Sequence, residues 1–350
     1  MNVLKPELVW VDGRCYRMLE KTESDGIVPY TEDDYFDHEN QEEFNDADIE
    51  ITPYGSSRFQ HSFHVAKSFF PIIIGSKHTV RKRIETETKT SIRIPKMGQD
   101  GDIVITGFSR KGIITARRRI DLLIETSRKR LGYTHFLSIP LHDGHIIMKF
   151  NEFKNNVLTE SGKGSRGVNE KIFQTPSKLH LTIGLLKLLD NAEREQAIAA
   201  LEHCKKHIVK PIVKKYGQIP ICLQGTEIMN DDPAETRVLY AKLIDKNNAL
   251  QEVADEIVNY YASIGMLQKE RETVKMHVTL MNMKFKQRDE DGSKAHKSTE
   301  TFDGSGILKA HADTCFGETV LKEIHISQRH TIGTNGYYQT TAKIDLTMDS

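Results

Sequence analysis

Two short stretches of the chain carry the same set of side chains at the same spacing. Residues 178–183 read Lys-Leu-His-Leu-Thr-Ile, and residues 275–280 read Lys-Met-His-Val-Thr-Leu. An imidazole titrates near neutral pH and can give or take a proton, while a hydroxyl can hold a non-bridging phosphate oxygen. Two such sets facing one phosphodiester would supply an acid, a base and two phosphate contacts. The predicted catalytic residues are His180, Thr182, His277 and Thr279.

The alternation of polar and apolar residues in both stretches predicts β-strands with one buried face. A single strand histidine is usually structural, so the repeat carries the argument. Among the 15 histidines, only His180 and His277 are followed two residues later by threonine. We expect two lobes of similar build to bring both motifs to one cleft. Lys178 and Lys275 share the polar faces and are predicted to bind substrate.

A third alternating stretch, residues 323–329, contains His325 and Ser327. Serine replaces threonine there, and no lysine stands two residues before the histidine. Two interpretations stay open: an accessory substrate contact by His325 and Ser327, or a structural strand beside the site.

The composition is that of an ordinary globular chain, and 350 residues predict two or three domains. No apolar run approaches the roughly 20 residues of a membrane span, so no membrane association is expected. The four cysteines contain no Cys-x-x-Cys pair, which predicts reduced thiols in an intracellular protein. No ligand cluster has metal-binding spacing, so we expect neither a metal nor another cofactor.

The zero net charge hides a segregation along the chain. Residues 21–50 hold twelve acids and one base, whereas residues 56–131 hold seventeen bases and six acids. We expect residues 21–55 to be an acidic disordered linker. We expect the basic part to bind a polyanion such as RNA or single-stranded nucleic acid.

Residues 1–20 contain Asp12-Gly13 between apolar runs, which predicts a hairpin. Trp10 would anchor this hairpin on a partner or belong to a local cluster.

Residues 56–131 predict strand, short helix, basic helix, two strands and a long basic helix. This order, with Ile73-Ile74-Gly75 before the basic helix, resembles a type I KH domain. The resemblance implies a Gly-x-x-Gly loop that clamps a nucleic-acid backbone. The predicted nucleic-acid-binding residues are Gly75, Ser76, Lys77, His78, Arg81, Lys82 and Arg83.

His78 stands where KH domains have the fourth loop glycine. It would need another loop backbone or would itself contact phosphate. A KH fold used only as a protein scaffold is the alternative.

Residues 132–350 predict alternating strands and helices, including a helix over about 190–208 and two late strands near 318–328 and 337–346. The paired motifs resemble the two-histidine (2H) phosphoesterase superfamily, which implies a two-lobed α/β (α+β) fold. Residues 134–137 and 238–242 are similar to the branch related to the kinase-anchoring protein 7 domain. The resemblance implies metal-independent cleavage of 2′,5′-linked or 2′,3′-cyclic phosphates, or trimming of RNA 3′ ends.

The combination of these domains with residues 10–16 and 324–329 resembles the family of subunit 1 of the activating signal cointegrator 1 complex. The resemblance implies a nuclear location, a helicase and other complex subunits as partners, and roles in transcription coactivation and alkylation-damage repair.

Three hypotheses remain. The chain is an RNA-binding phosphodiesterase, a catalytically silent RNA-binding and scaffolding subunit, or a pure interaction protein.

Overall fold

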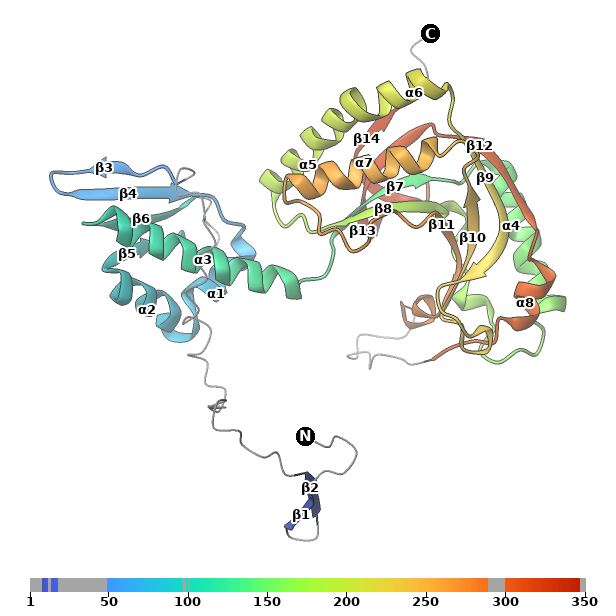
Figure 1. The fold of residues 1–350 in the computed structure, drawn as a ribbon, viewed down its shortest axis with the longest axis horizontal. Coiled ribbons are helices and arrows are strands. Elements are labelled where there is room, and N and C mark those ends of the chain that lie inside the picture. Colours follow the sequence, from blue (N-terminus) through green and yellow to red (C-terminus); the bar gives the residue numbers. More distant parts are fainter. Residues whose placement is uncertain are drawn as a thin grey trace. The chain divides into compact units, whose positions relative to one another are not determined.

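The computed structural model describes residues 8–11, 14–17, 49–96, 99, 101–288 and 300–346 (Figure 1). Chain contacts divide it into two units, residues 1–50 and 51–350. In the first unit, β1 (Leu8–Val11) pairs antiparallel with β2 (Arg14–Arg17). The Trp10 side chain and residues 18–48 lie outside the described part, and with them the predicted docking role and most of the acidic linker.

The second unit begins with a four-stranded antiparallel sheet in the order β3-β4-β6-β5. Isoleucines from the helices and strands form a common core, with Ile73, Ile84, Ile105 and Ile113 almost fully buried. The elements are β3 (Thr52–Tyr54), β4 (Arg58–Phe63), α1 (Phe70–Ile74), α2 (Thr79–Thr88), β5 (Thr90–Arg93), β6 (Ile103–Gly107) and α3 (Arg110–Arg130). This is the order predicted for a KH domain. The end of the predicted linker forms the edge strand β3, where Pro53 is tolerated because an edge residue needs no amide donor.

The loop between α1 and α2 has the backbone that glycine normally provides. Gly75 has φ 71°, and a Cβ there would lie 2.5 Å from Cγ2 of Val80. Lys77 and His78 also have positive φ values, 50° and 65°. His78 therefore adopts a left-handed conformation that glycine takes readily, at the strain cost that a Cβ imposes.

An eight-stranded antiparallel sheet, ordered β12-β9-β10-β11-β8-β7-β13-β14, forms the second domain. It consists of two four-stranded halves joined through the β11–β8 pair (Figure 1). The strands are β7 (His135–Pro140), β8 (His180–Leu186), β9 (Pro220–Ile228), β10 (Val238–Ile244), β11 (His277–Asn282), β12 (Cys315–Val320), β13 (Glu323–Ile332) and β14 (Tyr338–Asp345).

Helices cover the buried face of each half. α4 packs on β12 in one half, while α5 packs on β14 and α7 on β8 in the other. The helices are α4 (Gly144–Asn156), α5 (Asn191–Cys204), α6 (Lys210–Tyr216), α7 (Ala249–Ser263) and α8 (Ser305–Ala310). Leu181, Val278 and Leu250 are fully buried in the resulting core.

Two sequence predictions in this domain were wrong in detail. The late strand predicted near 318–328 is two strands, β12 and β13, separated at Leu321 and Lys322. The helix predicted over 190–208 continues through a π-helical turn (Lys205–Val209) into α6. Pro211 lacks an amide donor, and the wider π turn before it accommodates that loss.

The backbone of the α1–α2 loop predicts that substitutions at its two ends, Gly75 and His78, change the free energy of unfolding in opposite directions. Substituting His78→Gly should raise the free energy of unfolding by up to about 1 kcal/mol, because relief of left-handed strain exceeds the added chain entropy. Gly75→Ala should lower it by about 1–3 kcal/mol through strain and the Val80 clash. Urea unfolding measures both, with Ser76→Ala as control. Equal destabilisation by His78→Gly and Gly75→Ala would contradict the assigned backbone.

Candidate active site and nucleic-acid interface

The central strand pair brings both histidine motifs to one face of the sheet. Val278 of β11 pairs with Leu181 of β8, and both side chains point into the core. Continuing this antiparallel register places His180 opposite Thr279 and His277 opposite Thr182. Directly opposite residues have Cβ atoms about 4.5–5.5 Å apart, and diagonal ones about 7–8 Å apart. The two histidines are thus diagonal neighbours around a local two-fold axis.

Each imidazole is oriented by the same hydrogen bond. Nδ1 of His180 lies 2.7 Å from the carbonyl oxygen of Lys178, and Nδ1 of His277 lies 2.7 Å from that of Lys275. A carbonyl only accepts, so Nδ1 carries the hydrogen in both rings. In the neutral form Nε2 then has the free lone pair. Both rings are therefore set to exchange a proton through Nε2.

A tyrosine flanks each histidine on the side away from the other motif. Tyr338 meets His180 edge-on, with ring centroids 5.4 Å apart, and Tyr240 meets His277 at 5.5 Å. The two rings come from different places in the sheet, β14 and β10, and each covers one side of its imidazole. Neither tyrosine was among the sequence-predicted site residues.

The two motif lysines lie over these same aromatic rings. Nζ of Lys178 is 5.6 Å from the ring centre of Tyr338, and Nζ of Lys275 is 4.7 Å from that of Tyr240. Cation–π contacts of this kind hold a positive charge beside each histidine. Substrate binding by Lys178 and Lys275 stays a prediction that this placement allows.

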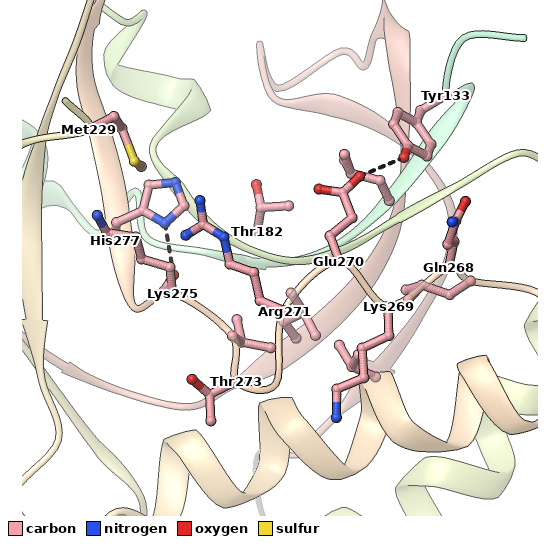
Figure 2. Close-up of a pocket in the computed structure, with 16 residues that line it drawn as sticks. Tyr133, Thr182, Met229, Gln268, Lys269, Glu270, Arg271, Thr273, Lys275 and His277 are labelled. Carbon is pink, nitrogen blue, oxygen red and sulfur yellow. Dashed lines mark hydrogen bonds between the residues drawn. The ribbon is translucent and has the colours of Figure 1, made fainter. Parts of the chain in front are cut away.

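A cavity of about 220 Å³ opens beside His277 (Figure 2). Three predicted residues line it: Thr182, Lys275 and His277. Its other walls include apolar side chains of Val258 and Leu267 and a group that sequence reasoning missed. That group is Tyr133, Glu270 and Arg271.

Burial lowers the pKa of both imidazoles, and nearby cations lower that of His277 further. Burial lowers the pKa of His180 to about 4, against the opposing bond to Lys178 and with a small further effect of His277. Burial lowers the pKa of His277 as well, assisted by the charges of Lys275 and Arg271. A bound anion would oppose these effects.

His325 and Ser327 lie on the same sheet face but beneath the surface. His325 pairs with Ser138, which in turn pairs with Thr182. Ser327 is fully buried, and its Oγ lies 3.0 Å from Oγ of Ser138. Nε2 of His325 lies 3.1 Å from a carboxylate oxygen of Glu323. These contacts favour the structural interpretation, and an accessory substrate contact stays a prediction.

The predicted nucleic-acid-binding residues occupy the α1–α2 loop and the first turns of α2. Lys77, His78 and Lys82 are exposed, whereas Arg81 is half-buried with its Nε 3.6 Å from Glu85. The positive loop side chains thus stand at the N-terminal end of α2, where backbone amides also favour anions.

Other possible sites were sought across the described residues. No group of three or more His, Cys, Asp and Glu side chains there is placed to hold a metal ion. Cys204, Cys222 and Cys315 are free thiols. None of the helices in the described part is long and apolar enough for a bilayer span.

Family comparisons agree with both domains. The sequence model of the AKAP7 2′5′ RNA ligase-like domain matches residues 133–346, and that of the KH domain matches residues 60–122. Activating signal cointegrator 1 complex subunit 1 of Mus musculus is 38% identical over 366 residues, covering 99% of both chains. The chain belongs to this subunit 1 family. The predicted fold class, a KH domain followed by a 2H phosphoesterase-like domain, is confirmed.

More distant similarities cover single parts of the chain. The uncharacterized protein C15D4.13c of Schizosaccharomyces pombe is 23% identical over 217 residues, covering 60% of this chain and 95% of its own. The first KH type I domain of human Vigilin is 25% identical, covers 25% of this chain and 92% of its own, and has a TM-score of 0.21. A structure titled as a phosphoesterase is 15% identical, covers 62% of this chain and 100% of its own, and has a TM-score of 0.36.

The depressed pKa of His180 predicts a pH-dependent stability. In the unfolded state His180 is protonated below about pH 6.5, whereas in the folded state it is protonated only below about pH 4. The contribution of His180 to the free energy of unfolding is therefore fully present at neutral pH, and it is lost as the pH is lowered from about 6.5 to about 4. From this residue alone, we expect a loss of roughly 2–3 kcal/mol between neutral pH and about pH 4.5.

The matched comparison is denaturant unfolding of the native protein, His180→Gln and His330→Gln at both pH values. His180→Gln should reduce the loss, whereas His330→Gln, an exposed histidine of β13, should not. Identical pH dependence in all three proteins would show that His180 does not titrate in this way.

Proposed function

We propose that the chain is an RNA-binding phosphodiesterase whose reaction uses His180 and His277 as base and acid. The observation that supports this most is the two-fold relation of the motifs about the Val278–Leu181 pair. It presents two equally oriented imidazoles and two threonine hydroxyls on one face. No comparably matched arrangement of proton donors and acceptors appears elsewhere in the described residues.

The reaction needs one proton removed and one supplied. His180 is neutral because of its burial, so its Nε2 lone pair is free to take the proton of the attacking water or ribose hydroxyl. A new P–O bond forms as the bond to the leaving oxygen breaks, and protonated His277 gives its Nε2 proton to that oxygen. Negative charge of the bound phosphate raises the pKa of His277 enough for this role.

Thr182 and Thr279 would stabilise the charge that grows on the phosphoryl oxygens. Each stands opposite the histidine of the other motif, so each hydroxyl lies beside one imidazole. Hydroxyls already fixed on a strand need little rearrangement as that charge develops. The substrates proposed are 2′,5′-linked, 2′,3′-cyclic or 3′-end phosphodiesters of RNA.

The KH domain supplies the proposed RNA-binding surface. Its loop has positive φ values at Gly75, Lys77 and His78, and exposed Lys77 and Lys82 add charge near the N-terminus of α2. Contacts of this type recognise the backbone of a single strand and leave cleavage to another site.

A second function remains compatible with the same site: a catalytically silent subunit that binds RNA and supports a complex. Low imidazole pKa values favour it, because proton donation then depends wholly on the bound phosphate. Membership of the subunit 1 family also supports, as a proposal, assembly with a helicase and other subunits. A nuclear location and roles in transcription coactivation and alkylation-damage repair belong to the same proposal.

Turnover of the three RNA substrate types separates these functions. His180→Ala and His277→Ala should each lower kcat by about 10²–10⁴-fold, because each removes one of the two proton transfers. Thr182→Val and Thr279→Val should lower it by about 10–10²-fold. His330→Ala is the control for loss of an imidazole from the same sheet. Equal turnover by the histidine variants would mean contaminating activity, and altered affinity without turnover would indicate the silent subunit.

RNA binding by the KH loop is tested with a charge-matched pair of variants. Lys77→Ala with Arg81→Ala should weaken single-stranded RNA binding and reduce the salt slope by about 1.4, from two phosphate contacts. The control, Lys111→Ala with Lys129→Ala, removes two charges from exposed positions on α3. Fluorescence anisotropy across salt concentrations measures both. Unchanged binding by the loop variant would place the strand in the histidine cleft instead.

A further inference from the structure

The segment between α7 and β11 is held at both ends and forms one wall of the cavity beside His277. At its start, the amides of Met266 and Leu267 donate to the carbonyl oxygen of Tyr261, and the Leu267 side chain is buried. At its end, the amide of Val274 donates to a carboxylate oxygen of Asp255 at 2.7 Å. Residues 268–273 therefore form a short bridge with fixed ends.

A hydrogen bond from a distant part of the domain fixes the middle of this bridge. The hydroxyl of Tyr133, just before β7, donates to Oε1 of Glu270 at 2.8 Å (Figure 2). Nζ of Lys187 lies 5.1 Å from the centre of the same tyrosine ring. The Tyr133–Glu270 contact therefore ties the bridge to the half of the sheet that carries His180.

Arg271, the next residue, points into the cavity. Figure 2 shows its guanidinium directed toward the imidazole of His277, and Thr182 of β8 lines the same cavity. Arg271 and His277 line the same cavity, and the positive charge of Arg271 lowers the pKa of His277. Across the described residues, no carboxylate forms an ion pair with Arg271. Arg271 is exposed to solvent, so its guanidinium is free to bind an anion that enters the cavity.

Lys269, two residues earlier, is the contrasting case. Its Nζ donates to Oδ1 of Asn259 at 2.9 Å, and Figure 2 shows it directed away from His277. Two cations of one bridge therefore point in different directions, and only Arg271 faces the site. The side chain of Arg271 therefore points into the cavity because of where residue 271 lies in the bridge, and not because every cation of the bridge does so.

We infer that Arg271 is a phosphate-binding residue of the His180/His277 site, held there by the Tyr133–Glu270 hydrogen bond. This inference rests on one part of the proposed function, the binding of a phosphoryl group at this site, and does not require catalysis. A guanidinium can donate two parallel hydrogen bonds to two phosphate oxygens. Arg271 would hold the non-bridging oxygens from the cavity side, while the threonines hold them from the sheet.

The test measures the equilibrium binding of inorganic phosphate and of adenosine 3′-monophosphate to the full-length chain by isothermal titration calorimetry. Arg271→Ala should weaken binding by about 10–100-fold, the usual effect of losing a charge-assisted contact. Arg271→Lys should keep part of the phosphate affinity, because the positive charge remains but the two parallel donors of the guanidinium are lost. Lys269→Ala should change affinity by less than about twofold, since its Nζ is bound to Asn259 and directed away from His277, where salt screens its charge.

Two further readouts distinguish a phosphate contact from a structural role. NMR titration of His277 without phosphate should show its pKa raised in Arg271→Ala, because a neighbouring positive charge is removed. Tyr133→Phe and Glu270→Gln should weaken phosphate binding less than Arg271→Ala does. They remove the hydrogen bond that holds residues 268–273 but keep the guanidinium of Arg271.

Affinity within about twofold of wild type in Arg271→Ala would overturn the inference. Equal weakening by Lys269→Ala would also overturn it, by showing a general charge effect. Wild-type protein that binds neither probe would do the same. Failure of catalysis is separate: binding that depends on Arg271 without RNA turnover would end the proposed reaction alone, whereas turnover insensitive to Arg271→Ala would end only this inference.

Discussion

The pairing of β8 with β11 is the constraint on which the site depends. Because Val278 stands opposite Leu181, the histidine of each motif stands opposite the threonine of the other. A slip of one residue would turn one motif into the core, since strand side chains alternate between faces. The buried Leu181 and Val278 side chains oppose such a slip, so the hydrophobic core sets the geometry of the polar face.

The sequence predicted this part of the structure well because its signal is local. Alternation within residues 178–183 and 275–280 assigns each side chain to a face without knowledge of the partner strand. The KH domain was predictable for the same reason, since helix and strand periods are visible in residues 58–130. His78 is instructive: its type argued against the usual loop, yet its φ of 65° shows that the surrounding fold imposes the glycine conformation.

What the sequence did not predict depends on contacts between distant elements. Tyr240 lies beside His277 because β10 pairs with β11 so that Tyr240 stands opposite Thr279 and Lys242 opposite His277. Arg271 belongs to a bridge without periodicity, whose direction is set by Asp255, Tyr261 and Tyr133. The division of β12 from β13 was missed because Leu321-Lys322 contains neither glycine nor proline. These features follow from tertiary packing, which local patterns do not encode.

The electrostatics of the site connect protonation with anion binding. Burial lowers the pKa of both imidazoles, and the charges of Lys275 and Arg271 lower that of His277 further. The same cations attract a phosphate, whose negative charge then favours a proton on His277. By thermodynamic linkage, a ligand that raises the pKa of a group must itself bind more tightly when that group is protonated. The neutral resting state is compatible with the proposed acid catalysis, because a bound phosphate would favour the protonated form of His277.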